Sequence, residues 1–496
     1  MMQSRRRFLQ RTLFTLPAIG SLSACGGGGG SSGGASSTCT PGSSLLSAIS
    51  STPLSGGVQG TQLVNFSPLA KPALGAAVTD PDFGSRIVRV SDAFNHFNCT
   101  NCVTTYSSTQ AWNCDESYMI LYAQGPLSSS SPSTWALFDG MPPYGFIKFL
   151  PNFAPSDVEQ FWWSKTDPKT VLYISNYSEG STDYCQLVSY EVDTGAKTVL
   201  YDFVPMLRKL GWPITGPVRA GYPLANGGNN VIWGLGAGGI ANINGYLALN
   251  AFGFNLETQE VVLYNGIAVA EQRNMCPAPL ISGRGWFWSD INFPSGSQYE
   301  TWTFDTCGNV VRKLPFSAIE HVDTSMNSAG DDLLVGPQFD TAIVGNIIRA
   351  NLTTGAIDTI VGQSNGYGYT RTGSFSGSTC YKNPPWVVGA AVGSPYGTNS
   401  DLSPATSATL RTQLDQEVFI ANMDTGATYR LAHHRSTGAW SNATTSNYWA
   451  QPNVTISPSG TRILFNSDWG NANPSSPVVN DPGAYTDTYI IELPQF

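Results

Sequence analysis

The chain alternates apolar and polar residues in short runs, separated by turns rich in Asp, Asn, Thr and Gly. One unit of two such runs around a tight turn recurs along the sequence, at 189–202, 253–265, 302–314, 348–361 and 419–432, with a looser copy at 135–150. Alternation with a period of two predicts β-strands with one face buried, and glycine supplies the positive φ that a tight turn needs. The repeated unit therefore predicts antiparallel hairpins.

A second pair of apolar runs precedes these hairpins, and the two pairs together predict a four-stranded blade. Clear copies lie at 110–123, 161–175, 321–336 and 453–468. The innermost strands are expected to begin near Gln110, Gln160, Arg219, Cys276, His321, Trp386 and Asn453. Their number predicts an all-β fold, a seven-bladed β-propeller over residues 84–496. No stretch shows sustained helical periodicity, which argues against an α/β fold.

The last blade lacks a fourth strand, because the sequence ends on a third one. Residues 84–92 alternate like a strand but have no blade of their own. The economical solution is that this N-terminal strand completes the seventh blade, which closes the ring and removes an exposed edge.

The N-terminus carries features of an export signal. Residues 4–10 resemble a twin-arginine motif, and an apolar stretch leads to residues 22–25, which resemble a lipoprotein cleavage box. The resemblance implies that residues 1–25 are a signal peptide and that Cys25 becomes lipidated. It also implies a protein exported to the periplasm or cell surface and anchored to a membrane, with Gly26 favouring the outer membrane. Residues 26–83, which begin almost entirely with Gly and Ser, are expected to form a flexible tether.

Composition narrows the class of partner. Charged residues make up 12% of the chain, against about 25% in ordinary globular proteins. The net charge is −9 and the body of the chain has no cluster of Lys or Arg, which argues against nucleic acid. A chain that is low in charge and contains 11% aromatic residues suits an exported β protein with a carbohydrate or oligosaccharide partner. We expect a monomer that meets the membrane only through its lipid.

Cysteine usage predicts disulfides. Apart from Cys25 the chain has eight cysteines, and an even number in an oxidising compartment favours pairing. Cys276 and Cys307 are placed to close one blade. Cys99 and Cys102 have the spacing of a redox or zinc pair, but no second pair with zinc spacing accompanies them, so disulfides are the favoured interpretation.

Polar residues are expected to gather at one mouth of the central channel. The innermost strand of each blade lines that channel, so the residues entering these strands converge: Gln110, Gln160, Arg219, Tyr222, Asn274, His321, Asp323, Gln451 and Asn453. The loop between blades six and seven adds His433, His434 and Arg435, and it holds two of the four histidines of the chain. This convergence predicts a ligand-binding or catalytic site. The alternative is that these groups only bond to backbone and trapped water.

Two stretches resemble the oligogalacturonate lyases, which are seven-bladed propellers of the polysaccharide lyase group. Residues 321–336 are similar to a histidine-bearing segment of that family, and residues 434–468 to its closing segment. The resemblance implies that His321 and His434 bind a divalent ion, Mn²⁺ or Ca²⁺. Gln451, and Asn453 beside it, stand where the family has two histidines. An amide is a weaker ligand than imidazole, and residues 273–280 lack the histidine that serves the family as base.

The lyase hypothesis assigns chemistry to these residues. In β-elimination a base removes the C5 proton of a uronate while a cation neutralises the carboxylate. Under this hypothesis the candidate bases are His321, His434 and Tyr222, and the candidate neutralising groups are Arg219 and Arg435. The substrate-binding set is Gln110, Gln160, Asn274, Asp323, His433, Arg435 and Asn453.

Two other functions remain open from the sequence. A non-catalytic glycan-binding propeller would use an aromatic platform, for which Trp162, Trp163 and Trp449 are candidates. A propeller that acts as a protein-interaction scaffold would have a plugged channel and an apolar patch on its rim.

Overall fold

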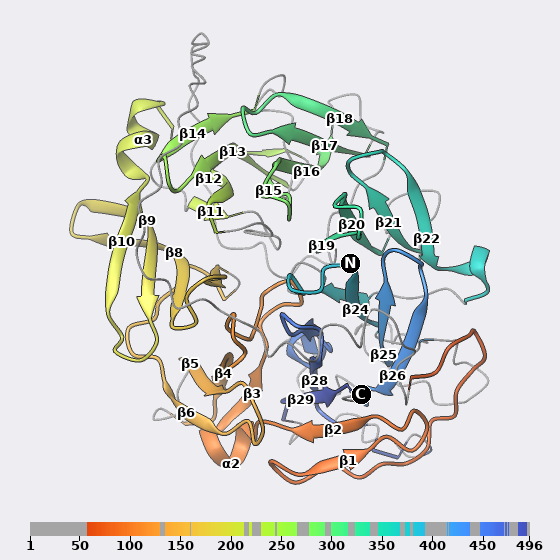
Figure 1. The fold of residues 1–496 in the computed structure, drawn as a ribbon. Helices are drawn as coiled ribbons and strands as arrows, with labels where there is room; N and C mark the ends of the chain where they lie inside the picture. Colours follow the sequence, from red (N-terminus) through yellow and green to blue (C-terminus); the bar gives the residue numbers. More distant parts are fainter. Residues whose placement is uncertain are drawn as a thin grey trace.

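Seven antiparallel sheets form a ring around a central channel (Figure 1). The structure is a computed structural model. It describes residues 57–128, 134–158, 160–212, 218–220, 230–243, 246–264, 277–292, 299–315, 323–337, 346–367, 373–376, 380–391, 414, 416–436, 447–470, 472–473, 475 and 485–493. The predicted all-β, seven-bladed propeller is confirmed.

The first six blades each contain four strands that follow one another in sequence from the channel to the rim. Blades one to three are β3 (Cys99–Val103), β4 (Tyr118–Pro126), β5 (Thr134–Asp139), β6 (Phe146–Phe149); β7 (Phe161–Trp163), β8 (Thr170–Glu179), β9 (Thr182–Glu191), β10 (Lys197–Asp202); and β11 (Val218–Ala220), β12 (Ile232–Ile243), β13 (Tyr246–Asn255), β14 (Glu260–Leu263). Blades four to six are β15 (Ala278–Pro279), β16 (Gly285–Asn292), β17 (Tyr299–Asp305), β18 (Val310–Leu314); β19 (Asp323–Met326), β20 (Asp332–Pro337), β21 (Ile347–Asn351), β22 (Ile357–Val361); and β23 (Gly373–Ser376), β24 (Trp386–Ala391), β25 (Glu417–Asn422), β26 (Thr428–His433).

The seventh blade joins the two ends of the described chain. From the channel outward it contains β27 (Thr455–Ile456), β28 (Arg462–Ser467), β29 (Asp487–Glu492), β2 (Arg86–Arg89) and β1 (Ala77–Thr79). Ile87 of β2 pairs with Ile491 of β29. The predicted closure of the ring by an N-terminal strand is confirmed, and β1 adds a fifth strand outside it.

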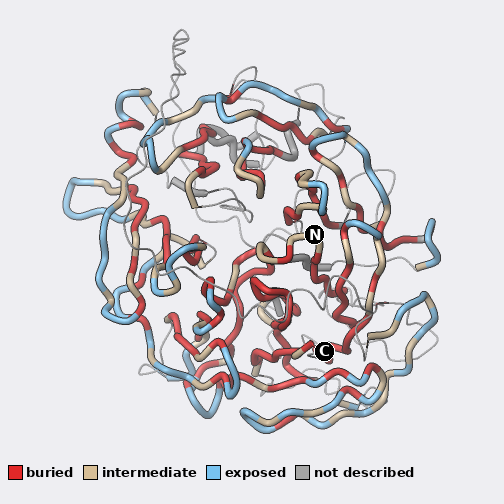
Figure 2. The backbone as a smooth tube through the Cα atoms, in the orientation of Figure 1, coloured by how far each residue is buried: buried red, intermediate tan, exposed pale blue. Residues whose placement is uncertain are grey.

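The packing of β2 explains why the ring closes here. Ile87 is fully buried in a cluster shared with blade six, whereas the next residue, Val88, is buried in a cluster shared with blade one. Successive residues of a strand point to opposite faces, so the closing strand fills the gaps on both sides of its blade. In Figure 2 the described residues of the inner strands are mainly buried, and those along the rim are mainly exposed.

The propeller begins earlier in the sequence than residue 84. Residues 57–83 were expected to belong to a tether, yet Val58 pairs with Arg430 on the outer edge of blade six. Leu69 donates a backbone hydrogen bond to Ala472. The helices among the described residues are α2 (Ala93–Phe97), α3 (Val204–Lys209), η2 (Gln363–Asn365) and η4 (Asn447–Ala450). Within the described ranges, no helix has the length and apolar character needed to cross a membrane.

Two innermost strands differ from the expected positions. In blade one the innermost strand is β3, which begins at Cys99 and pairs with β4. The residues near Gln110 come later in the chain and pair with β4 through the isolated Trp112–Met119 bridge. In blade six the innermost strand is β23, and Trp386 begins the second strand instead. The sequences of β3 (CTNCV) and β23 (GSFS) are short and mostly small or polar, so they give little hydrophobic alternation.

The disulfide prediction is wrong for most described cysteines. Cys99, Cys102, Cys185, Cys307 and Cys380 are thiols, so Cys307 does not close a blade with Cys276, which lies outside the described residues. Among the described cysteines only Cys114 is in a disulfide. Four of the five thiols are buried, where each acts as a small apolar side chain in the blade packing.

Candidate functional site

Several predicted site residues lie outside the part of the chain that the structure describes. These are Cys25, Tyr222, Asn274 and His321, and Arg219 is described only as backbone in β11. Their predicted roles stay predictions.

Two of the predicted channel residues have clear structural surroundings. Gln110 donates from Nε2 to the Ile456 carbonyl at 3.0 Å and accepts from the Trp112 amide at 2.9 Å, so it joins blades one and seven. Asn453 is fully buried, and neither Nδ2 nor Oδ1 of its amide has a hydrogen-bond partner among the described residues. A buried amide without partners is costly, which makes Asn453 a candidate to contact a ligand or a water molecule.

The other predicted amides are also buried. Gln160 is 2% exposed and Gln451 is 8% exposed. Gln160 stands immediately before β7, as expected for a residue that enters an innermost strand.

His434 is held by the backbone on both sides of its ring. Its Nε2 lies 3.1 Å from the Ala391 carbonyl, and its Nδ1 accepts a hydrogen bond from the Ser436 amide at 3.1 Å. This pattern requires the neutral tautomer with hydrogen on Nε2. Both ring nitrogens are thereby engaged, so in this arrangement His434 offers no lone pair to an ion.

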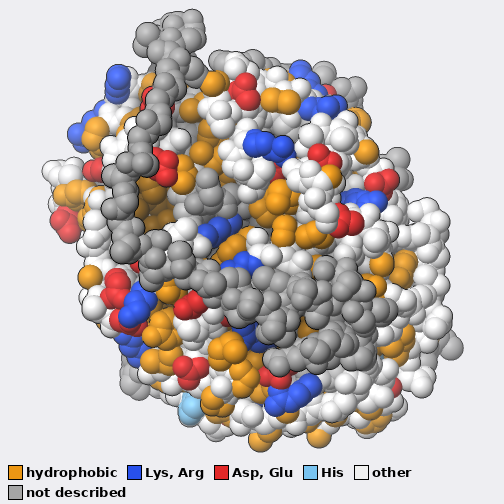
Figure 3. Space-filling model, in the orientation of Figure 1, with side chains coloured by type: hydrophobic (Ala, Val, Ile, Leu, Met, Phe, Trp, Pro, Cys, Tyr) orange, Lys and Arg blue, Asp and Glu red, His pale blue; other side chains and the backbone are white. Residues whose placement is uncertain are grey.

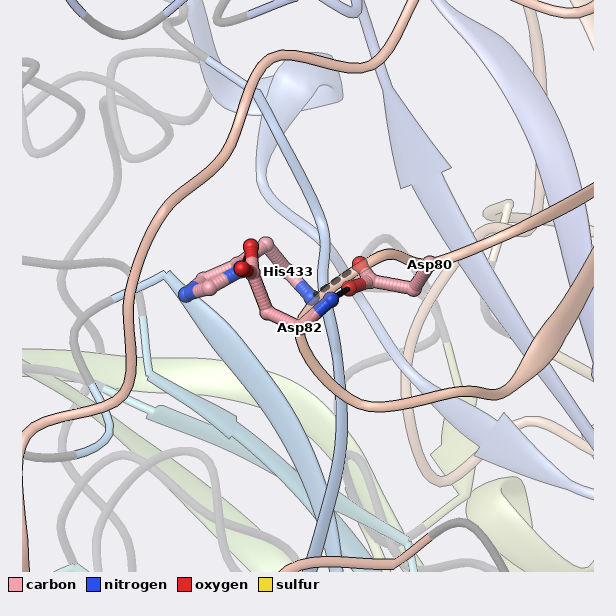
Figure 4. Close-up of side chains that lie close together, drawn as sticks. All are labelled: Asp80, Asp82 and His433. Atoms are coloured by element: carbon pink, nitrogen blue, oxygen red, sulfur yellow. Dashed lines mark hydrogen bonds and ion pairs between the residues drawn. The ribbon is translucent and has the colours of Figure 1, made fainter.

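His433 instead faces a turn of the N-terminal hairpin (Figure 4). It ends β26, on the outer edge of blade six, while Asp80 and Asp82 lie between β1 and β2, on the outer edge of blade seven. His433 Nδ1 is 3.8 Å from Asp82 Oδ2, and the His433 amide donates to Asp80 Oδ2 at 3.3 Å. The three side chains could hold a metal ion, because one ligand atom from each lies within 4.8 Å of the others.

Arg435 adds one positive charge to this group. Its guanidinium is fully buried, 3.7 Å from Asp80 Oδ2 and 5.0 Å from the Phe66 ring centroid. Burial raises the pKa of Asp80, and the charge of Arg435 opposes that effect. Asp80 and Asp82 were not among the predicted site residues.

A different group meets in the middle of the ring. Lys165 follows β7 of blade two, Asp323 begins β19 of blade five, and Tyr381 precedes β24 of blade six. The Lys165 Nζ lies 4.8 Å from the Tyr381 ring centroid. Because blade two is not adjacent to blade five or blade six, their residues can meet only across the channel.

The electrostatics of this channel group favour proton transfer. Burial lowers the pKa of Lys165 to about 7, although the charge of Asp323 acts in the opposite direction. Burial also raises the pKa of Tyr381 above its usual value, and no described residue is a hydrogen-bond partner of its hydroxyl. A lysine that loses its proton near neutral pH and a phenol that keeps it are a base and an acid in one place.

Lys382 adds a second cation to this region. Its Nζ donates to the Cys114 carbonyl of blade one, and burial lowers its pKa. In the space-filling view, Lys and Arg side chains lie near the middle of the ring on the face shown (Figure 3). An anionic ligand would find positive charge there.

The aromatic platform predicted for a binding protein is not formed by the two neighbouring tryptophans. Trp162 and Trp163 are 7% and 3% exposed and pack between blades. Trp163 Nε1 donates to the Ala111 carbonyl of the neighbouring blade.

Comparisons with known proteins give distant structural likenesses. No family model matches the chain, and no curated protein does. Among solved structures, an oligogalacturonate lyase from Vibrio parahaemolyticus aligns over 88% of this chain and 99% of its own, with a TM-score of 0.49 and 10% identity. TolB from Acinetobacter baumannii aligns over 60% and 59%, with a TM-score of 0.31 and 15% identity. The GH74 enzyme of Niastella koreensis aligns over 74% of this chain and 52% of its own, with a TM-score of 0.37 and 11% identity.

Proposed function

We propose that the central channel binds a carboxylate-bearing sugar and cleaves a uronate glycan there by β-elimination, with Lys165 as the base. The observation that carries this proposal is the contact between Lys165 of blade two and Tyr381 of blade six across the channel. Lys165 is also within the electrostatic influence of Asp323 of blade five. We also propose, on the motifs in residues 4–25, that the protein is exported and anchored by lipid.

The reaction uses these side chains in complementary roles. The neutral amine of Lys165 takes the C5 proton, and the electron pair of that C–H bond forms the C4=C5 double bond. The C4–O4 bond breaks as it forms, and the departing oxygen takes a proton from the Tyr381 hydroxyl. A base acts best when its pKa is near the working pH, and the pKa of Lys165, at about 7, meets that condition.

Charge in the channel supports binding of the substrate carboxylate. Lys382, which follows Tyr381 in the sequence and donates to the Cys114 carbonyl of blade one, is one candidate for the positive group. Arg219, whose backbone lies in the innermost strand of blade three, is a second candidate. Neutralising the carboxylate stabilises the negative charge that develops at C5. The net charge of −9 repels a long polyanion at a distance, so a short oligosaccharide is the expected substrate.

The test follows the ultraviolet absorbance of the unsaturated product. The full chain is incubated with a panel of uronate oligosaccharides, and binding is measured separately by calorimetry. Lys165→Arg replaces the base by a cation that stays protonated at every working pH. We expect it to bind sugar and to lose about 10²–10⁴-fold in rate. Tyr381→Phe should also reduce the rate.

The matched control is Lys169→Met, in the same turn but exposed and paired with Asp193, which should leave the rate unchanged. Full activity in Lys165→Arg would refute the assignment of the base. Binding without any product across the panel would instead support a non-catalytic glycan-binding protein, and absence of binding would refute the whole proposal.

A further inference from the structure

We infer that Asp80, Asp82 and His433 bind a transition-metal dication, Zn²⁺ or Mn²⁺, which fastens the ring-closing hairpin to blade six. This site lies on the outer strands of blades six and seven, apart from the channel group. The inference therefore stands or falls independently of the proposed lyase activity.

The spacing of the donor atoms fits an ion better than direct contact. His433 Nδ1 and Asp82 Oδ2 are 3.8 Å apart, which is longer than a hydrogen bond. Two ligands that are each about 2.1 Å from an ion lie roughly 3–4 Å from one another. The third donor, from Asp80, lies within 4.8 Å of both, so a small closure of the turn would bring all three to one ion.

The ligands are held in place by further contacts. Asp82 accepts hydrogen bonds from the Ser67 amide at 2.7 Å and from the Ser67 hydroxyl at 2.6 Å. The His433 ring stacks on Phe66 with centroids 4.1 Å apart and meets Phe83 edge-on at 4.8 Å. Partners of this kind orient the donors of a metal site and typically affect its affinity.

The orientation of Asp80 is set by its own turn. Its Oδ1 accepts from the amides of Asp82 and Phe83 at 2.9 and 3.2 Å. Its Oδ2 is directed toward the amide of His433 and the guanidinium of Arg435. Each carboxylate oxygen has two lone pairs, so these bonds leave capacity for a cation.

Charge and donor type identify the class of ion. Two carboxylates and one guanidinium give this region a net charge of −1, which favours a cation over an anion. Ca²⁺ prefers six to eight oxygen ligands, whereas a set of one imidazole and two carboxylates suits Zn²⁺ or Mn²⁺. The competing occupant is a proton on the imidazole or on a carboxyl group.

The experiment measures metal uptake and thermal unfolding of the full chain. The protein is stripped with a chelator and titrated with Zn²⁺, Mn²⁺ or Ca²⁺, and bound metal is counted after gel filtration. We expect one equivalent of Zn²⁺ or Mn²⁺ and an upward shift in Tm, with no comparable response to Ca²⁺. Co²⁺ is a spectroscopic probe, because its visible absorption reports nitrogen ligation.

Variants separate this site from other cation sites. His433→Gln and Asp82→Asn should each weaken binding by about tenfold or more, and the Co²⁺ spectrum should change in His433→Gln. His96→Gln, at an exposed histidine on α2, is the control and should bind like the parent. If these variants fail to fold, Ser67→Ala removes only the hydroxyl that orients Asp82 and should still weaken uptake measurably.

Three outcomes would overturn the inference. The first is no uptake by the stripped parent protein. The second is equal uptake by the parent and by both ligand variants, which would place the ion elsewhere. The third is a Tm that responds to pH but not to metal, which would identify a proton as the occupant.

Discussion

The ion pair between Arg430 and Glu417 should be one of the main links between blade six and the N-terminal segment. Arg430 donates from Nε and Nη2 to the two Glu417 carboxylate oxygens, each at 2.6 Å, and both side chains are fully buried. Its Nη1 also donates to the Gln62 carbonyl at 2.6 Å. The Arg430 guanidinium therefore binds both β25 of blade six and the N-terminal segment at Gln62.

Removing the arginine should be costly, because it leaves a buried carboxylate without a counter-charge. Breaking a buried ion pair in this way costs about 3–5 kcal/mol, and the lost bond to Gln62 adds about 1 kcal/mol. We expect Arg430→Met to lose about 4–6 kcal/mol in the free energy of unfolding. The double variant Arg430→Met with Glu417→Leu removes both charges and should recover most of the ion-pair loss, since apolar replacement of such pairs is often neutral.

The assay is denaturant unfolding of the parent, both single variants and the double variant, which form a thermodynamic cycle. Limited proteolysis near residues 57–62 reports whether the N-terminal segment has detached. The reasoning is refuted if Arg430→Met lies within about 1 kcal/mol of the parent protein, the range of an exposed pair. It is also refuted if the double variant is no more stable than the single one.

Three further changes test the fold and the channel. In Gly234→Ala the new Cβ would lie 1.9 Å from the Pro277 carbonyl oxygen, so thermal unfolding should show a loss of about 1–3 kcal/mol or more in the free energy of unfolding. In the control Gly145→Ala the new Cβ would lie 3.4 Å from its nearest neighbour, and stability should change little. Ile87→Ala, fully buried in the closing strand, should lose about 2–5 kcal/mol in denaturant titrations, and a smaller loss would show that closure is weak. Since the pKa of Lys165 falls from 10.5 in the unfolded chain to about 7, the unfolded state binds more protons between these values, and stability should rise with pH across that window. Lys165→Met should abolish that rise when Tm is measured below and above neutral pH, and an unchanged slope would contradict the pKa assignment.

The blade pattern could be predicted because it depends on local alternation. Ile87 and Val88, for example, are neighbours that face different blades, and this is visible in the sequence as an apolar run between polar ends. The innermost strands of blades one and six escaped prediction for the same reason. Their short runs of Ser, Thr, Gly and Cys pair through the backbone, with little apolar side chain to mark them.

The site was only partly predictable because it depends on which segments meet. His433 and His434 were expected to converge on the channel, and the structure sends them to different partners, as neighbours at a strand end face opposite ways. Asp80 and Asp82 were hidden in a segment whose composition resembled a tether, although residues 77–92 do alternate around a turn that contains them. Lys165 was not among the predicted site residues, because only the ring geometry places it across from Tyr381.

Closure of the ring links the rim to the channel. The channel group comes from blades two, five and six, so its geometry depends on the orientation of each blade relative to its neighbours. The orientation of blade six depends on how the ring is closed, where blades six, seven and one meet. The N-terminal segment is bonded to blade six through Arg430 and His433 and to the rest of blade seven through β2. Loosening that segment should therefore let blade six move and separate Tyr381 from Lys165 without altering either residue. Rim variants such as Arg430→Met should therefore weaken ligand binding in the channel under conditions in which the protein is still folded.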